Sequence, residues 1–155
     1  MRVFEGEFRA GDLRIAIVAS RFNPEIVDRL VRGALTTLES CGADPARLSL
    51  VYVPGAFDLP PVVRQIAQAP GCDAIVALGA VIRGETAHFD FVAAECAAGL
   101  ARVAAETGVP VAFGVLTTNT AEQALERAGG SEGNKGSDAA RAAIELASLM
   151  RKLRV

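Results

Sequence analysis

Four short apolar runs are distributed along the sequence. They are "RIAIVAS" (14–20), "LSLVYVPG" (48–55), "DAIVALGAVI" (73–82) and "VPVAFGVLTT" (109–118). Each run is largely continuous rather than alternating and ends at small or turn residues, a pattern typical of strands that are covered on both faces. The sequence therefore predicts a buried sheet with a layer of structure on each side.

The segments between these runs have helical spacing. The first extends from about Pro24 to Cys41, starts with proline, stops at Gly42 and carries an apolar residue at every fourth position along one stripe. Two further helices are expected at about 59–69 and 88–107. Alternating strands and helices favour a parallel sheet with helices on both faces. A chain of 155 residues fits a single domain, which we place at 1–155.

The remainder of the chain predicts a short helix at 121–128 and a last helix at 137–153. The last helix and the 88–107 helix are apolar around most of their circumference, and 51% of the chain is apolar without counting its glycines. A four-stranded sheet cannot cover so much apolar surface. We therefore expect the second face of these helices to meet another subunit, giving a homo-oligomer.

Charge and cysteine content exclude several classes of function. The formal net charge is −2, and no run of basic residues is long enough to bind along a phosphate backbone. Nucleic acid is therefore not an expected partner. No apolar run reaches the ~18 residues of a membrane span, and the first residues lack the apolar core of a signal peptide. Cys41, Cys72 and Cys96 are widely spaced and show no metal-binding pattern, which indicates reduced thiols in the cytoplasm.

Ligands of an open parallel sheet bind beyond the carboxyl ends of its strands, so the loops that follow the four runs are the candidate site. Phe22 and Phe57 lie in the first two of these loops, outside the apolar stripes. They can stack on a planar ligand or plug the edge of the core. The residues alone leave both interpretations open.

The third loop, "RGETAHFD", lies where a helix begins. Gly84, Glu85 and Thr86 come where the first helical amides lack intrahelical partners, which favours an anion site. The Thr86 hydroxyl can bind that anion or cap the helix. His88, the only histidine, falls in the first turn, where the helix dipole favours a neutral imidazole that can exchange protons. The alternative is a surface or capping histidine, and Asp90 can simply complement the dipole.

The glycine-rich stretch "GGSEGNKG" (129–136) is not a P-loop, because Asn134 precedes Lys135 and a helix precedes the stretch. We interpret it as a flexible hinge between two helices. Arg127 precedes this stretch and Lys135 lies near its end, and both can add positive charge to a phosphate site. The loops contain neither a supported serine, histidine and acid arrangement nor a dinucleotide fingerprint.

Taken together and in order, the loops resemble the 6,7-dimethyl-8-ribityllumazine synthase family of riboflavin biosynthesis. The matching motifs are "SRFN", "VPGAFDLP", "GAVIRGETAHFDFV", "GVLTTNTAEQALERAG" and "GNKGSDAA". The resemblance implies an α/β fold, a three-layer flavodoxin-like domain with a four-stranded parallel sheet flanked by helices. It also implies a homopentamer or an icosahedral 60-mer built from such pentamers. The compact turn before the last helix favours the 60-mer.

The family condenses 5-amino-6-(D-ribitylamino)uracil with 3,4-dihydroxy-2-butanone 4-phosphate, which yields 6,7-dimethyl-8-ribityllumazine, phosphate and water. The resemblance therefore implies a cytoplasmic transferase that acts on two small molecules with neither a metal nor an organic cofactor. Riboflavin synthase is a possible partner that a shell could enclose, and the sequence does not decide whether it is enclosed. The alternatives are a flavin or pteridine carrier without activity and a purely structural shell protein.

The resemblance also implies a role for each matching residue. His88 transfers protons and Phe22 stacks on the pyrimidine ring. The uracil substrate is further contacted by Ala56, Phe57, Asp58, the backbone of Ala80, Val81 and Ile82, and Phe113 of an adjacent subunit; the butanone phosphate is bound by Glu85, Thr86 and Arg127, with Lys135 and Asp138 in support. The family more often has glutamate where this chain has Asp58, so the carboxylate reaches about one methylene less far toward the ribityl chain.

Overall fold

The computed structural model describes residues 1–154 and has a four-stranded parallel sheet at its centre. The strands are β1 (Ile15–Ser20), β2 (Leu48–Val53), β3 (Ala74–Ile82) and β4 (Val111–Thr118), in the order β2-β1-β3-β4. Ile15 pairs with both Leu48 and Ala74, and Ile82 pairs with Thr118. All four predicted strands are confirmed within a few residues of their expected bounds.

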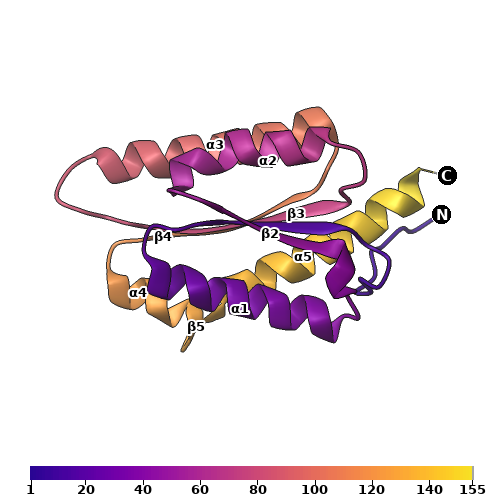
Figure 1. The fold of residues 1–155 in the computed structure, drawn as a ribbon, viewed down its shortest axis with the longest axis horizontal. Coiled ribbons are helices and arrows are strands. Elements are labelled where there is room, and N and C mark those ends of the chain that lie inside the picture. The colour runs from indigo at the N-terminus through magenta and orange to yellow at the C-terminus, as the bar shows by residue number, and fades with distance from the viewer. Residues whose placement is uncertain (155) are drawn as a thin grey trace.

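Helices cover both faces of the sheet, which confirms the three-layer α/β prediction (Figure 1). One layer holds α2 (Leu59–Gln68) and α3 (His88–Thr107), and the other holds α1 (Pro24–Ser40), α4 (Ala121–Glu126) and α5 (Lys135–Leu153). Two short 3-10 helices, η1 (Pro45–Arg47) and η2 (Ala56–Asp58), flank β2. Both termini lie at one end of the molecule, and the β3–α3 loop arches out at the other end (Figure 1).

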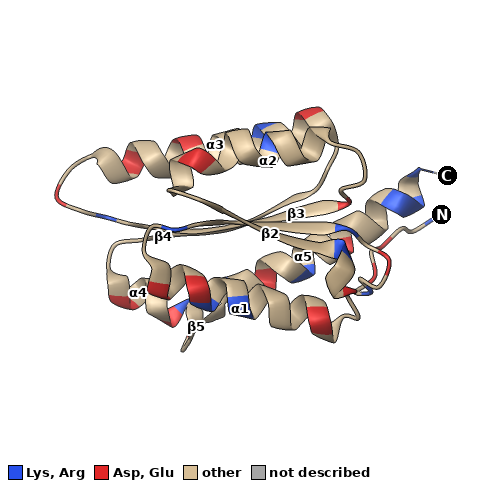
Figure 2. Cartoon of the chain, viewed as in Figure 1, with Lys and Arg blue, Asp and Glu red and all other residues tan. Residues whose placement is uncertain are grey.

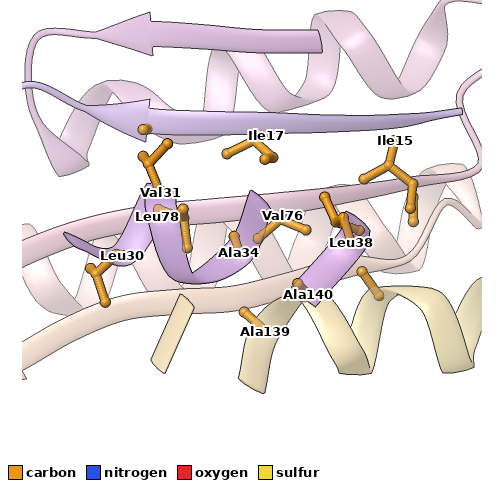
Figure 3. Close-up of a cluster of buried hydrophobic side chains, with 14 of the residues drawn as sticks. Ile15, Ile17, Leu30, Val31, Ala34, Leu38, Val76, Leu78, Ala139 and Ala140 are labelled. Atoms are coloured by element: carbon orange, nitrogen blue, oxygen red, sulfur yellow. The ribbon is translucent and has the colours of Figure 1, made fainter. Parts of the chain in front are cut away.

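The core is divided between the two faces of the sheet, because neighbouring residues of a strand point in opposite directions. Ile15 and Ile17 of β1 face α1 and α5, and Ala16 and Val18 face α2 and α3. Figure 3 shows the first of these clusters, where Leu30 and Leu38 of α1 meet Val76 and Leu78 of β3, with Ala139 and Ala140 of α5 nearby. Burying one such leucine or isoleucine contributes roughly 1.5–3 kcal/mol, so the continuous apolar runs stabilise both layers.

The glycine-rich stretch is a small hairpin, which corrects the prediction of a flexible hinge. β5 (Ala128–Gly130) pairs antiparallel with β6 (Gly133–Asn134). Gly129 (φ 101°) and Gly133 (φ 81°) adopt left-handed conformations that other residues rarely tolerate. The Asn134 side chain accepts hydrogen bonds from the amides of residues 136 (2.8 Å) and 137 (3.2 Å), so α5 begins at Lys135, two residues before its predicted start.

The outer faces of the helices are not uniformly polar. Charged residues of both signs lie on the helices and loops, and most of the sheet carries none (Figure 2). Leu146 and Leu153 of α5 are 42% and 56% exposed, and Ala97 and Ala101 of α3 are also exposed. The second apolar faces expected for these two helices are thus uncovered in a single chain. Within residues 1–154, no helix combines the length and apolarity needed to cross a bilayer.

Candidate active site

A cavity of about 550 Å³ opens beyond the carboxyl ends of β1, β2 and β3. It lies at the end of the molecule where the β3–α3 loop arches out, away from the termini (Figure 1). This is the position expected for a ligand in an open parallel sheet, and the volume suits a small organic molecule. The lining residues are Phe22, Gly55, Ala56, Phe57, Asp58, Ala80, Val81, Ile82, Gly84, Thr86, His88, Phe89, Phe91 and Val92.

The turn after β1 carries Phe22 to the cavity. Its backbone is tied to the end of β2 by hydrogen bonds from the Arg21 amide to the Val53 carbonyl (2.8 Å) and from the Phe22 amide to the Pro54 carbonyl (3.1 Å). The Phe22 side chain is 70% exposed. It therefore projects into the mouth of the cavity and does not plug the core.

The loop after β2 carries a second exposed ring, Phe57, at 61% exposure. Phe57 belongs to η2, which is closed by a hydrogen bond from the Gly55 amide to Oδ2 of Asp58 (3.0 Å). The second carboxylate oxygen of Asp58 makes no hydrogen bond within residues 1–154 and is available to a ligand. The exposure of Phe57, like that of Phe22, removes the interpretation that these rings plug the edge of the core.

The β3–α3 loop brings the third element of the site. His88 is the first residue of α3, and Ala87 precedes it as an N-cap without a side-chain hydrogen bond. The Thr86 hydroxyl accepts a hydrogen bond from the His88 amide at 3.4 Å, which is too long for a strong cap. Both Thr86 and His88 line the cavity. The start of this 20-residue helix thus directs weakly capped amides toward an opening where an anion can bind.

Five of the predicted site residues are not among those that line the cavity. Glu85 is exposed in the β3–α3 loop, and the other four lie elsewhere in the chain. Phe113, Arg127, Lys135 and Asp138 line a separate hollow of about 440 Å³ along β4, and this hollow shares no residue with the cavity. Arg127 donates from Nη1 to the Gln123 carbonyl (3.0 Å) and also lies 3.5 Å from the Glu126 carboxylate. The structure therefore brings Phe22, the residues that follow β2, the end of β3, Thr86 and His88 together in one cavity, and it leaves these four apart.

Comparison with known proteins identifies the family of the chain. The family model for 6,7-dimethyl-8-ribityllumazine synthase matches residues 12–151. The 6,7-dimethyl-8-ribityllumazine synthase of Halorhodospira halophila (strain DSM 244 / SL1) is 53% identical over 154 residues, which cover 99% of each chain. The chain belongs to the 6,7-dimethyl-8-ribityllumazine synthase family. A second relative with the same name, from Nitratidesulfovibrio vulgaris (strain DP4), is 50% identical over 153 residues, covering 99% of this chain and 98% of its own.

The lumazine synthase match contains every candidate site residue, from Phe22 to Asp138. It also contains cavity residues that sequence reasoning missed, among them Phe89, Phe91 and Val92 of α3. Helical residues two positions apart point in different directions, so Phe91 does not share the half-buried side of Phe89, and it is 70% exposed at the cavity.

Proposed function

We propose that the cavity beyond β1–β3 is the place where this chain condenses 5-amino-6-(D-ribitylamino)uracil with 3,4-dihydroxy-2-butanone 4-phosphate. As a member of the family, the chain is a transferase of riboflavin biosynthesis. The observation that carries the proposal is the meeting of two exposed phenyl rings with the start of a long helix in one cavity. That combination suits one planar substrate and one phosphorylated substrate held side by side.

The ring-binding half of the proposed site consists of Phe22, Phe57 and the end of β3. Aromatic rings stack on a flat pyrimidine through offset contacts, each worth about 0.5–1.5 kcal/mol beyond the area that is buried. The backbone of Ala80–Ile82 supplies hydrogen-bonding groups along one edge of that ring. The free oxygen of Asp58 takes the ribityl hydroxyls, with its other oxygen holding the η2 turn.

The phosphate-binding half consists of the backbone at Glu85 and Thr86 and the start of α3. A helix of 20 residues carries a partial positive charge at its first turn, and its free amides donate to phosphate oxygens. His88 lies in that same turn, next to the proposed phosphate position. In this proposal, proton exchange and phosphate departure take place within one helical turn of each other.

The proposed chemistry suits a site without a protein nucleophile. An amine of the uracil substrate attacks the carbonyl of the butanone phosphate, and water leaves as the imine forms. Phosphate is then eliminated, which leaves a ketone. The ribityl-bearing amine attacks that ketone and a second water leaves as the ring closes to the lumazine. Most of the rate advantage comes from holding the two reactants together, which can be worth ~7–11 kcal/mol. His88 carries the protons of these steps, and no metal or organic cofactor takes part.

The hollow along β4 supplies the rest of the proposed site from a second subunit. Phe113 and Arg127 line the same hollow, so a neighbour that brings Phe113 to the cavity also brings the Arg127 guanidinium toward the phosphate. Lys135 and Asp138 accompany them in support. The uncovered apolar faces of α3 and α5 favour such an assembly.

The proposed assembly is a homopentamer, and the compact hairpin before α5 favours closure of pentamers into an icosahedral 60-mer. Riboflavin synthase is the partner that the family resemblance suggests for such a shell. The three free thiols suit the cytoplasm, where residues 1–155 would act as one domain. Light scattering distinguishes the assemblies, because a particle of pentamer size would exclude the shell.

A lumazine assay tests the function. Purified protein is mixed with both substrates, and lumazine fluorescence is recorded together with released phosphate. The proposal predicts that the two products appear in equal amounts. The rival function is a flavin or pteridine carrier, and a carrier of riboflavin or lumazine has no use for a phosphate-binding helix start. Tight binding of the uracil substrate without formation of lumazine would favour that carrier.

A further inference from the structure

Arg83 joins the two ends of the loop that leads into α3. Its amide donates to the Thr118 carbonyl (2.9 Å), and its Nε donates to Oδ1 of Asn119 (3.0 Å), just beyond β4. On the other side of the loop, its Nη2 lies 3.3 Å from Oδ1 of Asp90. Its guanidinium carbon also lies 4.5 Å from the centroid of the Phe89 ring. One side chain therefore connects the end of β4 with the first turn of α3.

We propose that Arg83 is a positioning residue for the phosphorylated substrate. It lines neither the cavity nor the hollow along β4, so it acts through the residues it holds. Phe89 lines the cavity, and Asp90 lies two residues after His88. By holding both, Arg83 fixes the first turn of α3, with its phosphate-facing amides, relative to the sheet. This inference rests on the proposed function, because the phosphate position is part of that proposal.

Arg83 also has an electrostatic role. Asp90 places a carboxylate in the same helical turn that is proposed to receive a phosphate dianion. An unpaired carboxylate there would repel the substrate, since charges a few ångströms apart interact appreciably even near solvent. The guanidinium of Arg83 offsets that charge at 3.3 Å. The Asp90 carboxylate can then interact favourably with the helix dipole without repelling the phosphate.

The contacts require arginine in particular. A planar guanidinium presents one edge to Asn119, another to Asp90 and a face to the ring of Phe89. A lysine ammonium has no planar face and cannot make the three contacts together. Because the Arg83 and Asp90 side chains are 46% and 58% exposed, their ion pair contributes little to overall stability. The effect of removing Arg83 should therefore concern substrate binding more than folding.

The test compares steady-state kinetics of Arg83→Ala and Arg83→Lys with the unsubstituted protein. We expect KM for the butanone phosphate to rise by about tenfold in each variant, since small misplacements of positioning groups have effects of this order. The inhibition constant of inorganic phosphate, measured against the same substrate, should rise in parallel. KM for the uracil substrate should stay within about twofold, because Phe22 and Phe57 are untouched.

Arg64→Ala is the matched control. Arg64 also pairs with a carboxylate of α3, through a 2.7 Å contact to Glu106. Glu106 lies in the last turn of that helix, at the opposite end from the β3–α3 loop. The Arg64→Ala variant should leave KM for the butanone phosphate and KM for the uracil substrate unchanged. In the double variant Arg83→Ala with Asp90→Asn, loss of the unpaired carboxylate should recover part of the affinity for phosphate.

The outcomes separate the inference from the proposed function. Unchanged phosphate inhibition in both Arg83 variants, with lumazine formed normally, would overturn the role of Arg83 alone. Equal rises in both KM values would also overturn it, because they indicate a general structural role. Absence of lumazine in the unsubstituted protein would instead overturn the proposed function. If Arg83→Ala does not fold, Arg83→Lys tests the role of Arg83 through KM for the butanone phosphate and the inhibition constant of inorganic phosphate.

Discussion

Asn23 donates a 3.1 Å hydrogen bond from its side-chain Nδ2 to the carbonyl oxygen of Ala80. The bond links the turn after β1 to the end of β3. Asn23 is also the one non-glycine residue within 1–154 with a positive φ, at 58°. Such a conformation costs of order 1–3 kcal/mol and persists where the surroundings enforce it, often at functional sites. Here it sets the direction of the turn that carries Phe22 over the cavity.

Loss of the Asn23 side chain should weaken binding of the uracil substrate. Asn23→Gly keeps access to the left-handed conformation but removes the hydrogen bond, so we expect Kd to rise about fivefold, the size of one net hydrogen bond. Asn23→Ala adds backbone strain and should also lower the stability of the fold. Calorimetric titration with the uracil substrate alone measures the first effect. Wild-type affinity in the glycine variant would show that the bond does not position Phe22.

Replacement of His88 should slow the reaction without abolishing it. His88→Ala removes the proposed proton carrier, a contribution of about a hundredfold or more in typical enzymes. Alignment of the two substrates survives, so a measurable rate should remain. The rate of lumazine formation is compared across pH at saturating substrates. A variant that keeps the wild-type rate over the whole pH range would disprove proton transfer by His88.

Ser20→Ala should stabilise the protein. The Ser20 hydroxyl is fully buried, and it is the one buried side-chain polar atom within residues 1–154 without a hydrogen-bond partner. A buried unsatisfied group costs about 1–3 kcal/mol, so its removal should raise the free energy of unfolding by about 1 kcal/mol. Ser49→Ala, at an exposed position on β2, is the control and should change little. Destabilisation by Ser20→Ala would mean that the hydroxyl has a partner.

The buried thiol of Cys96 predicts a loss of stability at high pH. Burial raises the pKa of Cys96 to about 11, so the folded state keeps this proton after the unfolded state has lost it. Stability is therefore complete below the ordinary thiol pKa and falls as the pH rises toward 11, by at most about 1.4 kcal/mol per pH unit. Urea unfolding between pH 8 and 11 measures the slope.

Cys96→Ala is the matched comparison for that slope. The substitution removes the titrating group and costs some core contacts, which lowers stability by a similar amount at every pH. The difference between the two proteins should therefore shrink as the pH rises. A difference that stays constant from pH 8 to 11 would show that Cys96 does not titrate in this range.

The strands and main helices could be predicted because the hydrophobic pattern alone specifies them. Continuously apolar runs such as residues 73–82 can only be strands or segments buried on all sides, and their short length decides between the two. The prediction for the glycine-rich stretch was wrong. A composition that includes Gly129 and Gly133 suggests a flexible segment, but in the structure these two residues belong to a tight hairpin. The pattern does not show which backbone angle each glycine adopts.

The candidate site was only partly predictable for a different reason. Loops after parallel strands must meet at one edge of the sheet, so Phe22, Phe57 and His88 were expected together and are found together. Arg127 follows β4, yet it lies in a separate hollow, because β4 is the edge strand and α4 and the hairpin lie beyond it. The hydrogen bond from the Gly55 amide to the Asp58 carboxylate likewise depends on side-chain geometry that the sequence pattern does not show.

In the proposed assembly, the cavity and the hollow along β4, which are separate in one chain, form one active site between two subunits. The most direct test unfolds His88→Ala and Arg127→Ala proteins together, refolds the mixture and measures its rate of lumazine formation. Each variant is impaired alone, but a mixed assembly contains sites that pair an intact cavity with an intact Arg127. A site shared in this way predicts recovery toward about one quarter of the wild-type rate, from random pairing of neighbours. A rate equal to the average of the two variants would contradict it.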